Sequence, residues 1–454
     1  TPSTATGTVK AVDGVCFCIE RGERVAVVGE SGSGKSAMAM SILRLLTHPG
    51  KVAGGDVLLD GRDISKLSEG QLNAIRGRLV GTVFQDPMSS LDPVMRISKQ
   101  MIEPIMRNLR LNREQAREEA IRWLGKVGIP EPERRIEAYP FEMSGGMRQR
   151  VMIAMALSSR PQLVIADEPT TALDVTIQAQ IVEVLKALTA ESGAAMMFIT
   201  HDLGLVARFA HKVAVMYAGR IVEFGRVEDI FAHPAHPYTQ SLLGTIPSTS
   251  MLKTERLPQI PGLPPDMRFP ITGCAFKERC AAAHDRCCVE APSLTDRGID
   301  HTAACWAPHG LGEGATLKAD RPDRPNKPFE PDGSVVVELN ALWKQFDTSR
   351  KMVVKAVNGV NLRVHKGETL GIVGESGCGK STLARLLLGL EKPTSGDIFI
   401  AGLAQMVFQD PASSFNPKMT IGDIVAEPLV VKARGNKPER MEAVRQLISQ
   451  VGLD

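Results

Sequence analysis

Two glycine-rich loops of this chain have the composition and spacing of phosphate-binding sites. Residues 29–36 and residues 374–381 both follow the pattern Gly-x-x-x-x-Gly-Lys-Ser. Each loop follows a short apolar run of strand type (residues 25–28 and 370–373) and opens a run of good helix formers. In that setting successive backbone N–H groups can converge on phosphate oxygens, and the helix N-terminus adds positive charge. Two matches in equivalent positions make chance negligible, so the sequence predicts two nucleotide sites.

The lysine and the serine of each loop have separate predicted roles. The lysine would bridge the outer phosphates, and the serine hydroxyl would bind magnesium. The predicted nucleotide contacts are Gly29, Ser31, Gly32, Ser33, Gly34, Lys35 and Ser36 in the first loop, and Gly374, Ser376, Gly377, Cys378, Gly379, Lys380 and Ser381 in the second.

An apolar strand in the first half of the chain ends in two acids. Residues 163–168 read Leu-Val-Ile-Ala-Asp-Glu. In a protein with a phosphate loop, an Asp at this place can hold magnesium opposite Ser36. The next carboxylate can orient or deprotonate an attacking water. Asp167 is therefore predicted as a magnesium ligand and Glu168 as the catalytic carboxylate.

Further motifs resemble those of the ATP-binding cassettes of ABC transporters, and they occur in the order of that family. Residues 143–147, Met-Ser-Gly-Gly-Met, resemble the signature motif but depart from its usual first Leu and last Gln. Residues 172–174 resemble the D-loop, residues 199–202 the switch-histidine segment, and Gln85 the Q-loop glutamine. The site residues that this resemblance implies are Ser144, Gly145, Gly146 and Asp174 for the nucleotide, His201 for the γ-phosphate, and Gln85 and Gln409 for magnesium and the attacking water.

The resemblance also implies the fold. It predicts an α/β protein with two P-loop (RecA-like) cassettes, the first with a helical subdomain at about residues 92–160. One helix of that subdomain is marked in the sequence itself, because Asn112 and Gln115 have the spacing of a capping box. We expect this helix to be a packing element only.

The chain repeats itself. Residues 11–36 are answered by residues 356–381, and residues 83–87 by residues 407–411. The predicted domains are a first cassette (1–235), its extension (236–310), a linker (311–333) and a second cassette (334–454). The second copy lacks a counterpart of the polar run 62–78 and of the later motifs. Either segments are missing from it or the copy is degenerate.

In the resembled family, ATP lies between the phosphate loop of one cassette and the signature of the other. The resemblance therefore implies intramolecular pairing, in which Lys380 and Ser381 share a nucleotide with residues 144–146. The aromatic residue that usually stacks on adenine is missing from the first copy, and Phe346 is a weak candidate in the second.

A cysteine cluster follows the first cassette, with the spacing Cys274-x5-Cys280-x6-Cys287-x17-Cys305. Four thiolates in a short proline-flanked segment predict a metal site rather than disulfides. The paired Cys-x2-Cys knuckles of structural zinc are lacking. The preceding run His-Pro-Ala-His-Pro-Tyr-Thr (233–239) resembles the C-terminal extension of oligopeptide and dipeptide importer ATPases, which implies a structural [4Fe–4S] cluster. Zinc is the alternative metal, and Cys288 is the alternative to Cys287.

Composition excludes other classes. With 54 basic and 51 acidic residues, the chain shows no nucleic-acid signature. It has no apolar run of the ~18–20 residues that cross a bilayer, and residues 1–10 do not resemble a secretory signal.

The family resemblance implies an ATPase at the cytoplasmic face of the inner membrane that energises import of peptides or similar small solutes. It would work with two membrane-spanning permease subunits and an extracytoplasmic solute-binding protein. The alternative is a soluble twin-cassette ABC ATPase acting on ribosomes or DNA.

Overall fold

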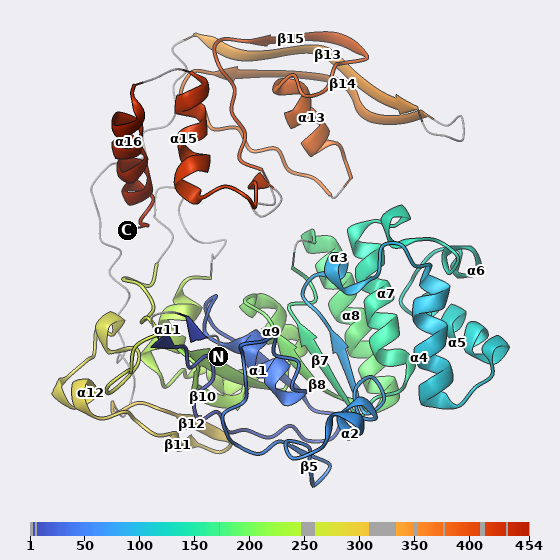
Figure 1. Cartoon of the computed structure of the whole chain (residues 1–454), viewed down its shortest axis with the longest axis vertical. Coiled ribbons are helices and arrows are strands. Elements are labelled where there is room, and N and C mark those ends of the chain that lie inside the picture. The colour runs from blue at the N-terminus through green and yellow to red at the C-terminus, as the bar shows by residue number, and fades with distance from the viewer. Residues whose placement is uncertain are drawn as a thin grey trace. The chain divides into compact units, whose positions relative to one another are not determined.

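The computed structural model of the chain describes residues 3–4, 7–171, 173–246, 259–307, 333–347, 353–375, 377–408, 414–432 and 435–453. The chain divides into two compact units, Thr1–Asn326 and Lys327–Asp454, drawn blue to yellow and orange to red in Figure 1.

An eight-stranded mixed sheet is the frame of the first unit. Five neighbouring strands, β9, β3, β8, β7 and β6, run parallel to one another. On the other side of β9 the sheet continues with β10, β12 and β11, which pair antiparallel. The apolar runs of β3 and β7 are buried, as expected of parallel strands with neighbours on both sides. In sheet order the strands are β11 (Thr295–Gly298), β12 (His301–Ala303), β10 (Arg220–Arg226), β9 (Lys212–Tyr217), β3 (Arg24–Val28), β8 (Ala195–Ile199), β7 (Leu163–Asp167) and β6 (Val80–Val83).

Helices complete the first unit, and β1 (Ser3–Thr4) pairs with β2 (Gly7–Thr8), as β4 (Leu58–Leu59) does with β5 (Arg62–Asp63). The helices α4, α5 and α7 pack together through one apolar cluster (Figure 1), within the range predicted for a helical subdomain. The helices are α1 (Lys35–Ile42), α2 (Glu69–Asn73), α3 (Pro87–Ser90), α4 (Ile97–Leu109), α5 (Arg113–Lys126), α6 (Pro132–Arg135), η1 (Pro140–Glu142), α7 (Gly145–Ser158), α8 (Val175–Ser192), α9 (Leu203–Phe209), α10 (Val227–Ala232), α11 (Pro237–Gly244), η2 (Lys277–Arg279) and α12 (Asp285–Val289).

The capping box predicted before α5 is confirmed. The Gln115 amide donates to Oδ1 of Asn112 at 2.9 Å, and the Asn112 amide donates to Oε1 of Gln115 at 3.1 Å. These two bonds satisfy donors that the first turn of a helix leaves unpaired, so the helix begins where the sequence indicates.

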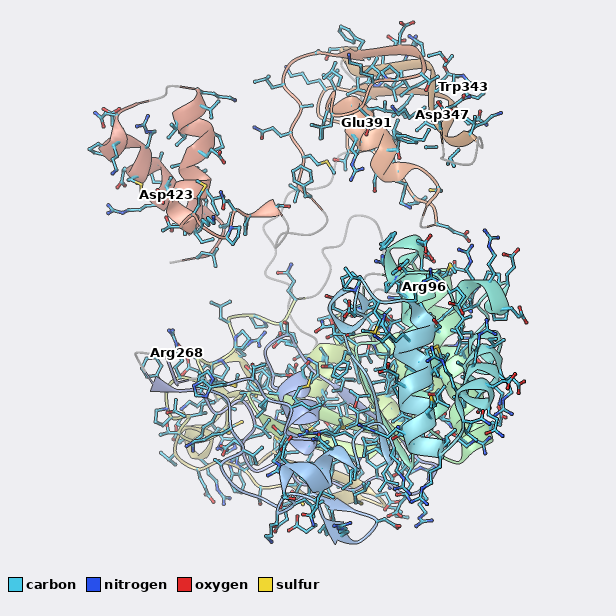
Figure 2. All side chains as sticks on the ribbon, turned by 45° about the vertical axis from the view of Figure 1, so that its right-hand side comes forward. Arg96, Arg268, Trp343, Asp347, Glu391 and Asp423 are labelled. Carbon is cyan, nitrogen blue, oxygen red and sulfur yellow. The ribbon has the colours of Figure 1, made fainter. Side chains whose placement is uncertain are left out.

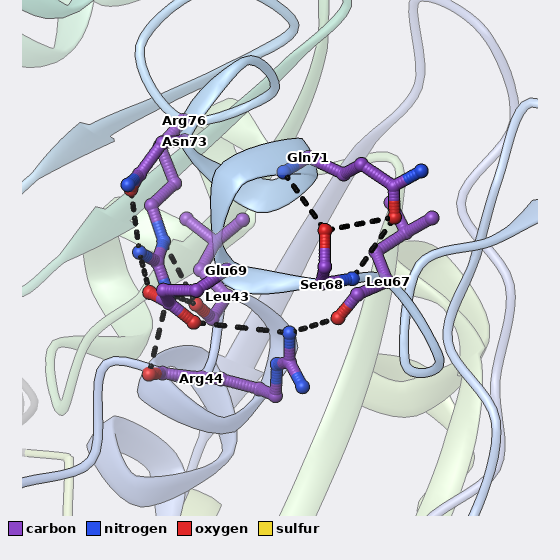
Figure 3. A network of polar contacts seen from close by, with 8 residues as sticks. All are labelled: Leu43, Arg44, Leu67, Ser68, Glu69, Gln71, Asn73 and Arg76. Carbon is purple, nitrogen blue, oxygen red and sulfur yellow. Dashed lines mark hydrogen bonds and ion pairs between the residues drawn. The ribbon is translucent and has the colours of Figure 1, made fainter.

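The polar run 62–78, which the second copy lacks, supports the helix of the phosphate loop. Figure 3 shows Arg76, just after α2, directed at the C-terminal end of α1: its Nε and Nη2 donate to the Leu43 carbonyl at 3.1 and 2.7 Å. A second capping box, between Ser68 and Gln71, starts α2. Arg76 therefore satisfies a carbonyl that the end of α1 leaves without an intrahelical partner.

The extension after the first cassette shares the core of the cassette. Phe276 is buried in the same apolar cluster as Val28, Tyr217 and Tyr238, and Cys274 and Cys280 pack against it. Its strand β12 pairs with β10 and so widens the cassette sheet. The extension is part of the first unit in packing as well as in sequence.

Glu223 is the polar centre of this junction. Its side chain on β10 is fully buried and accepts bonds from the amides of Ala235 (2.7 Å) and His236 (2.9 Å). Its Oε1 also lies 2.7 Å from Nε2 of His301 on β12. One carboxylate thus joins the cassette sheet, the His-Pro-Tyr segment and the extension strand.

We expect Glu223→Ala to lower the opening free energy of β12 by about 3 kcal/mol, because removing one partner leaves buried donors unpaired. Hydrogen–deuterium exchange of residues 295–307 should then speed up by about 100-fold. Glu228→Ala, at an exposed glutamate of α10, is the matched control. Equal exchange in the two variants would contradict this role.

The second unit contains a three-stranded antiparallel sheet in the order β14-β13-β15. Trp343, labelled in Figure 2, belongs to β13, and a Cβ on Gly359 of β14 would lie 3.3 Å from its ring. The elements are β13 (Val335–Asp347), β14 (Val353–His365), α13 (Lys380–Leu387), β15 (Ser395–Ile400), α15 (Ile421–Val431) and α16 (Lys437–Gln450).

The predicted strand at residues 370–373 is wrong. No strand forms there, and Leu370, Ile372 and Val373 are exposed, the last at 92%. The equivalent strand β3 is held between β8 and β9. No such neighbours flank residues 370–373 in the described part of the second unit, so this apolar run has no ladder to join.

Across the described residues, no helix has both the length and the apolar character required to cross a bilayer.

Candidate functional site

The first phosphate loop links β3 to α1 through a backbone that requires glycine. Gly29 and Gly34 have φ values of +152° and +102°. A Cβ on Gly29 would lie 2.1 Å from the Met216 carbonyl, and one on Gly34 would lie 2.0 Å from the Ala11 carbonyl. Only glycine permits such conformations and such close backbone contact.

Lys35 lies inside this loop with its side chain buried. Its Nζ donates to the carbonyls of Gly29 and Glu30, both at 2.8 Å, and lies 3.4 Å from the Ser33 hydroxyl. Burial lowers the pKa of Lys35, while the nearby carboxylates of Glu168, Asp167 and Glu30 raise it. The cation is thus held at the loop by weak carbonyl partners that phosphate oxygens can replace.

Ser36 and Asp167 meet at the end of β7. The Ser36 hydroxyl donates to Oδ1 of Asp167 at 3.0 Å. Burial, as the largest influence, raises the pKa of Asp167, and the hydrogen bond from Ser36 lowers it. Two oxygen ligands fit magnesium, which usually takes one or two carboxylates and completes its shell with phosphates and water. No group of three or more His, Cys, Asp or Glu suited to a metal occurs in the described part of the chain.

Glu168 follows β7 in a left-handed conformation, φ +45°. This backbone turns its carboxylate toward three side chains: Thr171 Oγ1 donates to it at 2.7 Å, Gln85 Nε2 donates at 3.0 Å, and His201 Nδ1 lies 3.4 Å away. The structure therefore brings the three predicted catalytic residues together. Thr171 was not predicted, because a threonine three residues after an acid is an unremarkable pattern in the sequence.

The signature and D-loop residues form a second group, at the starts of α7 and α8. The Ser144 hydroxyl caps α7 by accepting from the Met147 amide at 3.3 Å, and Gly145 and Gly146 are its first residues. Asp174 caps α8 by accepting from the Ile177 amide at 2.9 Å. The N-termini of α7 and α8 thus lie close together, since a Cβ on Gly146 would lie 3.2 Å from the Ile177 side chain.

The second phosphate loop repeats the lysine geometry of the first. Lys380 Nζ donates to the carbonyls of Gly374 (2.6 Å) and Glu375 (2.8 Å). A Cβ on Gly379 would lie 2.1 Å from the Ala356 carbonyl, the counterpart of Ala11. Gly377 and Cys378 complete the described loop, and Ser381 is the second residue of α13. Ser376, Gln409 and Ala172 of the D-loop lie outside the described residues.

The four predicted cysteine ligands line one cavity of the extension, together with His236 and Phe276. Cys288 is exposed and does not line it. Burial raises the pKa of Cys274, Cys280 and Cys305, that of Cys280 to about 11. Four cysteine thiols are the ligand set that an iron–sulfur cluster usually takes. In the described part of the chain, however, these thiols surround the cavity without lying close enough together to form a metal-binding group.

Comparison with known families agrees with this arrangement. The ABC transporter family model matches residues 12–171 and 357–454. The model of the oligopeptide/dipeptide transporter C-terminal region matches residues 222–287, which include the His-Pro-Tyr segment and three of the cavity cysteines.

Three relatives match over most of their lengths. The oligopeptide transport ATP-binding protein OppD of Mycobacterium tuberculosis is 42% identical, over 98% of this chain and 76% of the relative. OppD of Bacillus subtilis is 44% identical over 75% of this chain and 92% of the relative. The glutathione import ATP-binding protein GsiA of Escherichia coli O157:H7 is 38% identical, over 98% of this chain and 68% of the relative. The fold, the glycine-rich loops and these matches together show that the chain belongs to the ABC transporter family, among the ATPases related to the oligopeptide, dipeptide and glutathione importers.

Proposed function

We propose that this chain is the ATPase subunit that energises import of peptides or similar small solutes across the cytoplasmic membrane. The observation that carries the proposal is the convergence of Gln85, His201 and Thr171 on the Glu168 carboxylate. The names of the relatives, two oligopeptide transport ATP-binding proteins and one glutathione import ATP-binding protein, support the solute class.

In the proposed reaction, phosphate oxygens of ATP replace the loop carbonyls as partners of Lys35. Glu168 accepts a proton from water as the water oxygen bonds to the γ-phosphorus and the bond to the ADP oxygen breaks. Gln85 orients that water, and His201 contacts the γ-phosphate. Ser36, Asp167 and Gln85 would hold magnesium, with Ser381 and Gln409 in the same roles at the second loop. When bound there, the ion would neutralise charge on the phosphate oxygens.

We also propose that the two units are fused cassettes that pair within one chain. The matches of one family model to two separate segments support this. In that pairing Ser144, Gly145 and Gly146 contribute the amides of the α7 N-terminus to the nucleotide held by Lys380 and Ser381. ATP binding closes the pair, and hydrolysis reopens it.

The cysteine cavity is the proposed site of a structural [4Fe–4S] cluster held by Cys274, Cys280, Cys287 and Cys305. The common cavity lined by these four thiols supports the proposal, and the exposure of Cys288 favours Cys287 as the third ligand. The test is metal analysis of protein purified without oxygen. Iron and acid-labile sulfide in equal amounts support the cluster, whereas zinc without iron rejects it in favour of a zinc site.

The proposed location is the cytoplasmic face of the inner membrane, with two permease subunits and an extracytoplasmic solute-binding protein as partners. The test is a mild-detergent pull-down of the tagged full-length protein from native membranes, with the co-purifying proteins identified. Two multi-span permeases would support the importer. Ribosomal proteins or DNA-repair factors without a permease would reject it and leave the soluble ATPase.

A further inference from the structure

An ion pair between a buried arginine and a half-buried glutamate joins the extension to the first phosphate loop. The Arg279 guanidinium, 4% exposed, donates to both oxygens of Glu30: Nη1 to Oε2 at 2.7 Å and Nη2 to Oε1 at 2.9 Å. This bidentate contact raises the pKa of Arg279 above its usual value. Such a fork-to-carboxylate pair fixes orientation as well as distance.

Both members of the pair are held from their own sides. Arg279 Nε donates to the Pro261 carbonyl at 2.8 Å, and the guanidinium lies over the rings of Tyr217 and Phe276. The Glu30 amide donates to the Tyr238 hydroxyl at 2.8 Å. Each residue of the pair is thus held by further contacts on its own side. We therefore expect a displacement of Arg279 to move Glu30 as well.

The two ends of this link are the cysteine cavity and the phosphate-binding lysine. Arg279 ends η2 and directly precedes Cys280, whose thiol lines the cavity. At the other end, the Glu30 carbonyl accepts a hydrogen bond from Lys35 Nζ at 2.8 Å. A continuous series of contacts thus runs from Cys280 through Arg279 and Glu30 to Lys35.

The second phosphate loop shows that the loop itself does not require this restraint. Glu375 occupies the position of Glu30 in the repeat, and its residue is exposed. Lys380 nevertheless contacts the same loop carbonyls as Lys35. The ion pair is therefore an addition made by the extension to the first site alone, within the described residues.

We propose that Arg279 is a positioning residue of the first nucleotide site, and that it transmits the occupancy of the cysteine cavity to the phosphate loop. Metal that draws the thiols together displaces Cys280, and the rigid fork passes this displacement to Glu30. The inference rests on the proposed binding of ATP at residues 29–36. The proposed consequence is that metal in the cysteine cavity changes the nucleotide affinity of that site.

The first experiment measures nucleotide binding and ATPase kinetics of the full chain. We expect Arg279→Gln to raise the Kd of a fluorescent ADP analogue and the KM for ATP by about tenfold, within the usual range of coupled sites. The kcat should change less than about threefold, because Arg279 touches no reacting atom. Arg279→Lys keeps the charge without the fork and should fall between Arg279→Gln and the wild type.

Two further variants separate positioning from simple loss of stability. Glu30→Gln should match Arg279→Gln, and the double variant should be no worse than either single one, because both remove the same contact. Arg134→Gln breaks an exposed Arg–Glu pair of α6 (3.0 Å) and should bind nucleotide as the wild type does. Additive losses in the double variant would overturn the proposal.

The deciding experiment compares protein reconstituted with iron and sulfide with protein stripped by a chelator. The Kd of the wild type should differ at least about fivefold between the two forms, and that difference should vanish in Arg279→Gln. If the Kd of Arg279→Gln differs between the two forms as much as that of the wild type does, the proposal is overturned. A wild-type Kd that is the same with and without metal overturns it as well. If the wild type binds no nucleotide in either form, the proposed function fails instead.

Discussion

Replacing Glu168 with glutamine is expected to lower the ATPase rate by about 10²- to 10⁴-fold, the usual contribution of a positioned general base. Glutamine has nearly the same shape but accepts no proton at neutral pH. Thr171 and Gln85, which both donate to Oε2 of Glu168, can still donate to the carbonyl oxygen of the glutamine. Nucleotide binding should therefore remain, because Lys35 and the loop amides are unchanged. The measurement is steady-state ATP hydrolysis beside equilibrium binding of a fluorescent nucleotide.

Glu183→Gln, at an exposed position of α8, is the matched control and should hydrolyse ATP at the wild-type rate. Hydrolysis by Glu168→Gln within about threefold of this control would show that another group takes the proton. Loss of nucleotide binding in Glu168→Gln would show instead that the carboxylate holds the loop in shape.

Replacing Lys35 with alanine is expected to weaken nucleotide binding at the first loop by about 100-fold. Charge-assisted hydrogen bonds contribute about 1.5–3 kcal/mol each, and the loss of roughly 3 kcal/mol corresponds to that factor. The Lys35 ammonium is held between the Gly29 and Glu30 carbonyls, at the position where the phosphates are expected to bind. The measurement is the Kd of a fluorescent ADP analogue, with magnesium present.

Two lysines serve as comparisons for this variant. Lys66→Ala removes a surface lysine, 74% exposed, and should leave the Kd unchanged. Lys380→Ala tests the second loop by the same change, because its lysine has the same two carbonyl partners. If Lys35→Ala binds within about threefold of Lys66→Ala, residues 29–36 do not form the nucleotide site.

The extension matters to both predictions because it is built into the cassette. Glu223 of β10 contacts His301 of the extension, and Arg279 of the extension donates hydrogen bonds to Glu30 of the phosphate loop. A variant of the extension can therefore alter nucleotide binding without touching the nucleotide. Stability and affinity should be measured together for every variant of residues 260–307.

The local residue pattern was sufficient to predict those features that form within one short segment of the chain. The glycines at 29 and 34, the capping box at Asn112 and the strand that ends at Asp167 could all be predicted from neighbouring residues. Each rests on a conformation or a hydrogen bond within a few positions of the chain. The order of these motifs was also sufficient to indicate the ABC family.

Tertiary structure alone decided which distant groups meet. Arg279 and Glu30 are 249 positions apart, and no pattern near either residue marks the pair. Thr171 is only three positions from Glu168, but their contact depends on the left-handed turn after β7, which no residue pattern marks. Cys287, which is buried, lines the cavity, whereas Cys288 is exposed. The failed strand at residues 370–373 has the same cause. An apolar run becomes a central strand only where neighbouring strands supply hydrogen bonds, and those neighbours come from elsewhere in the chain.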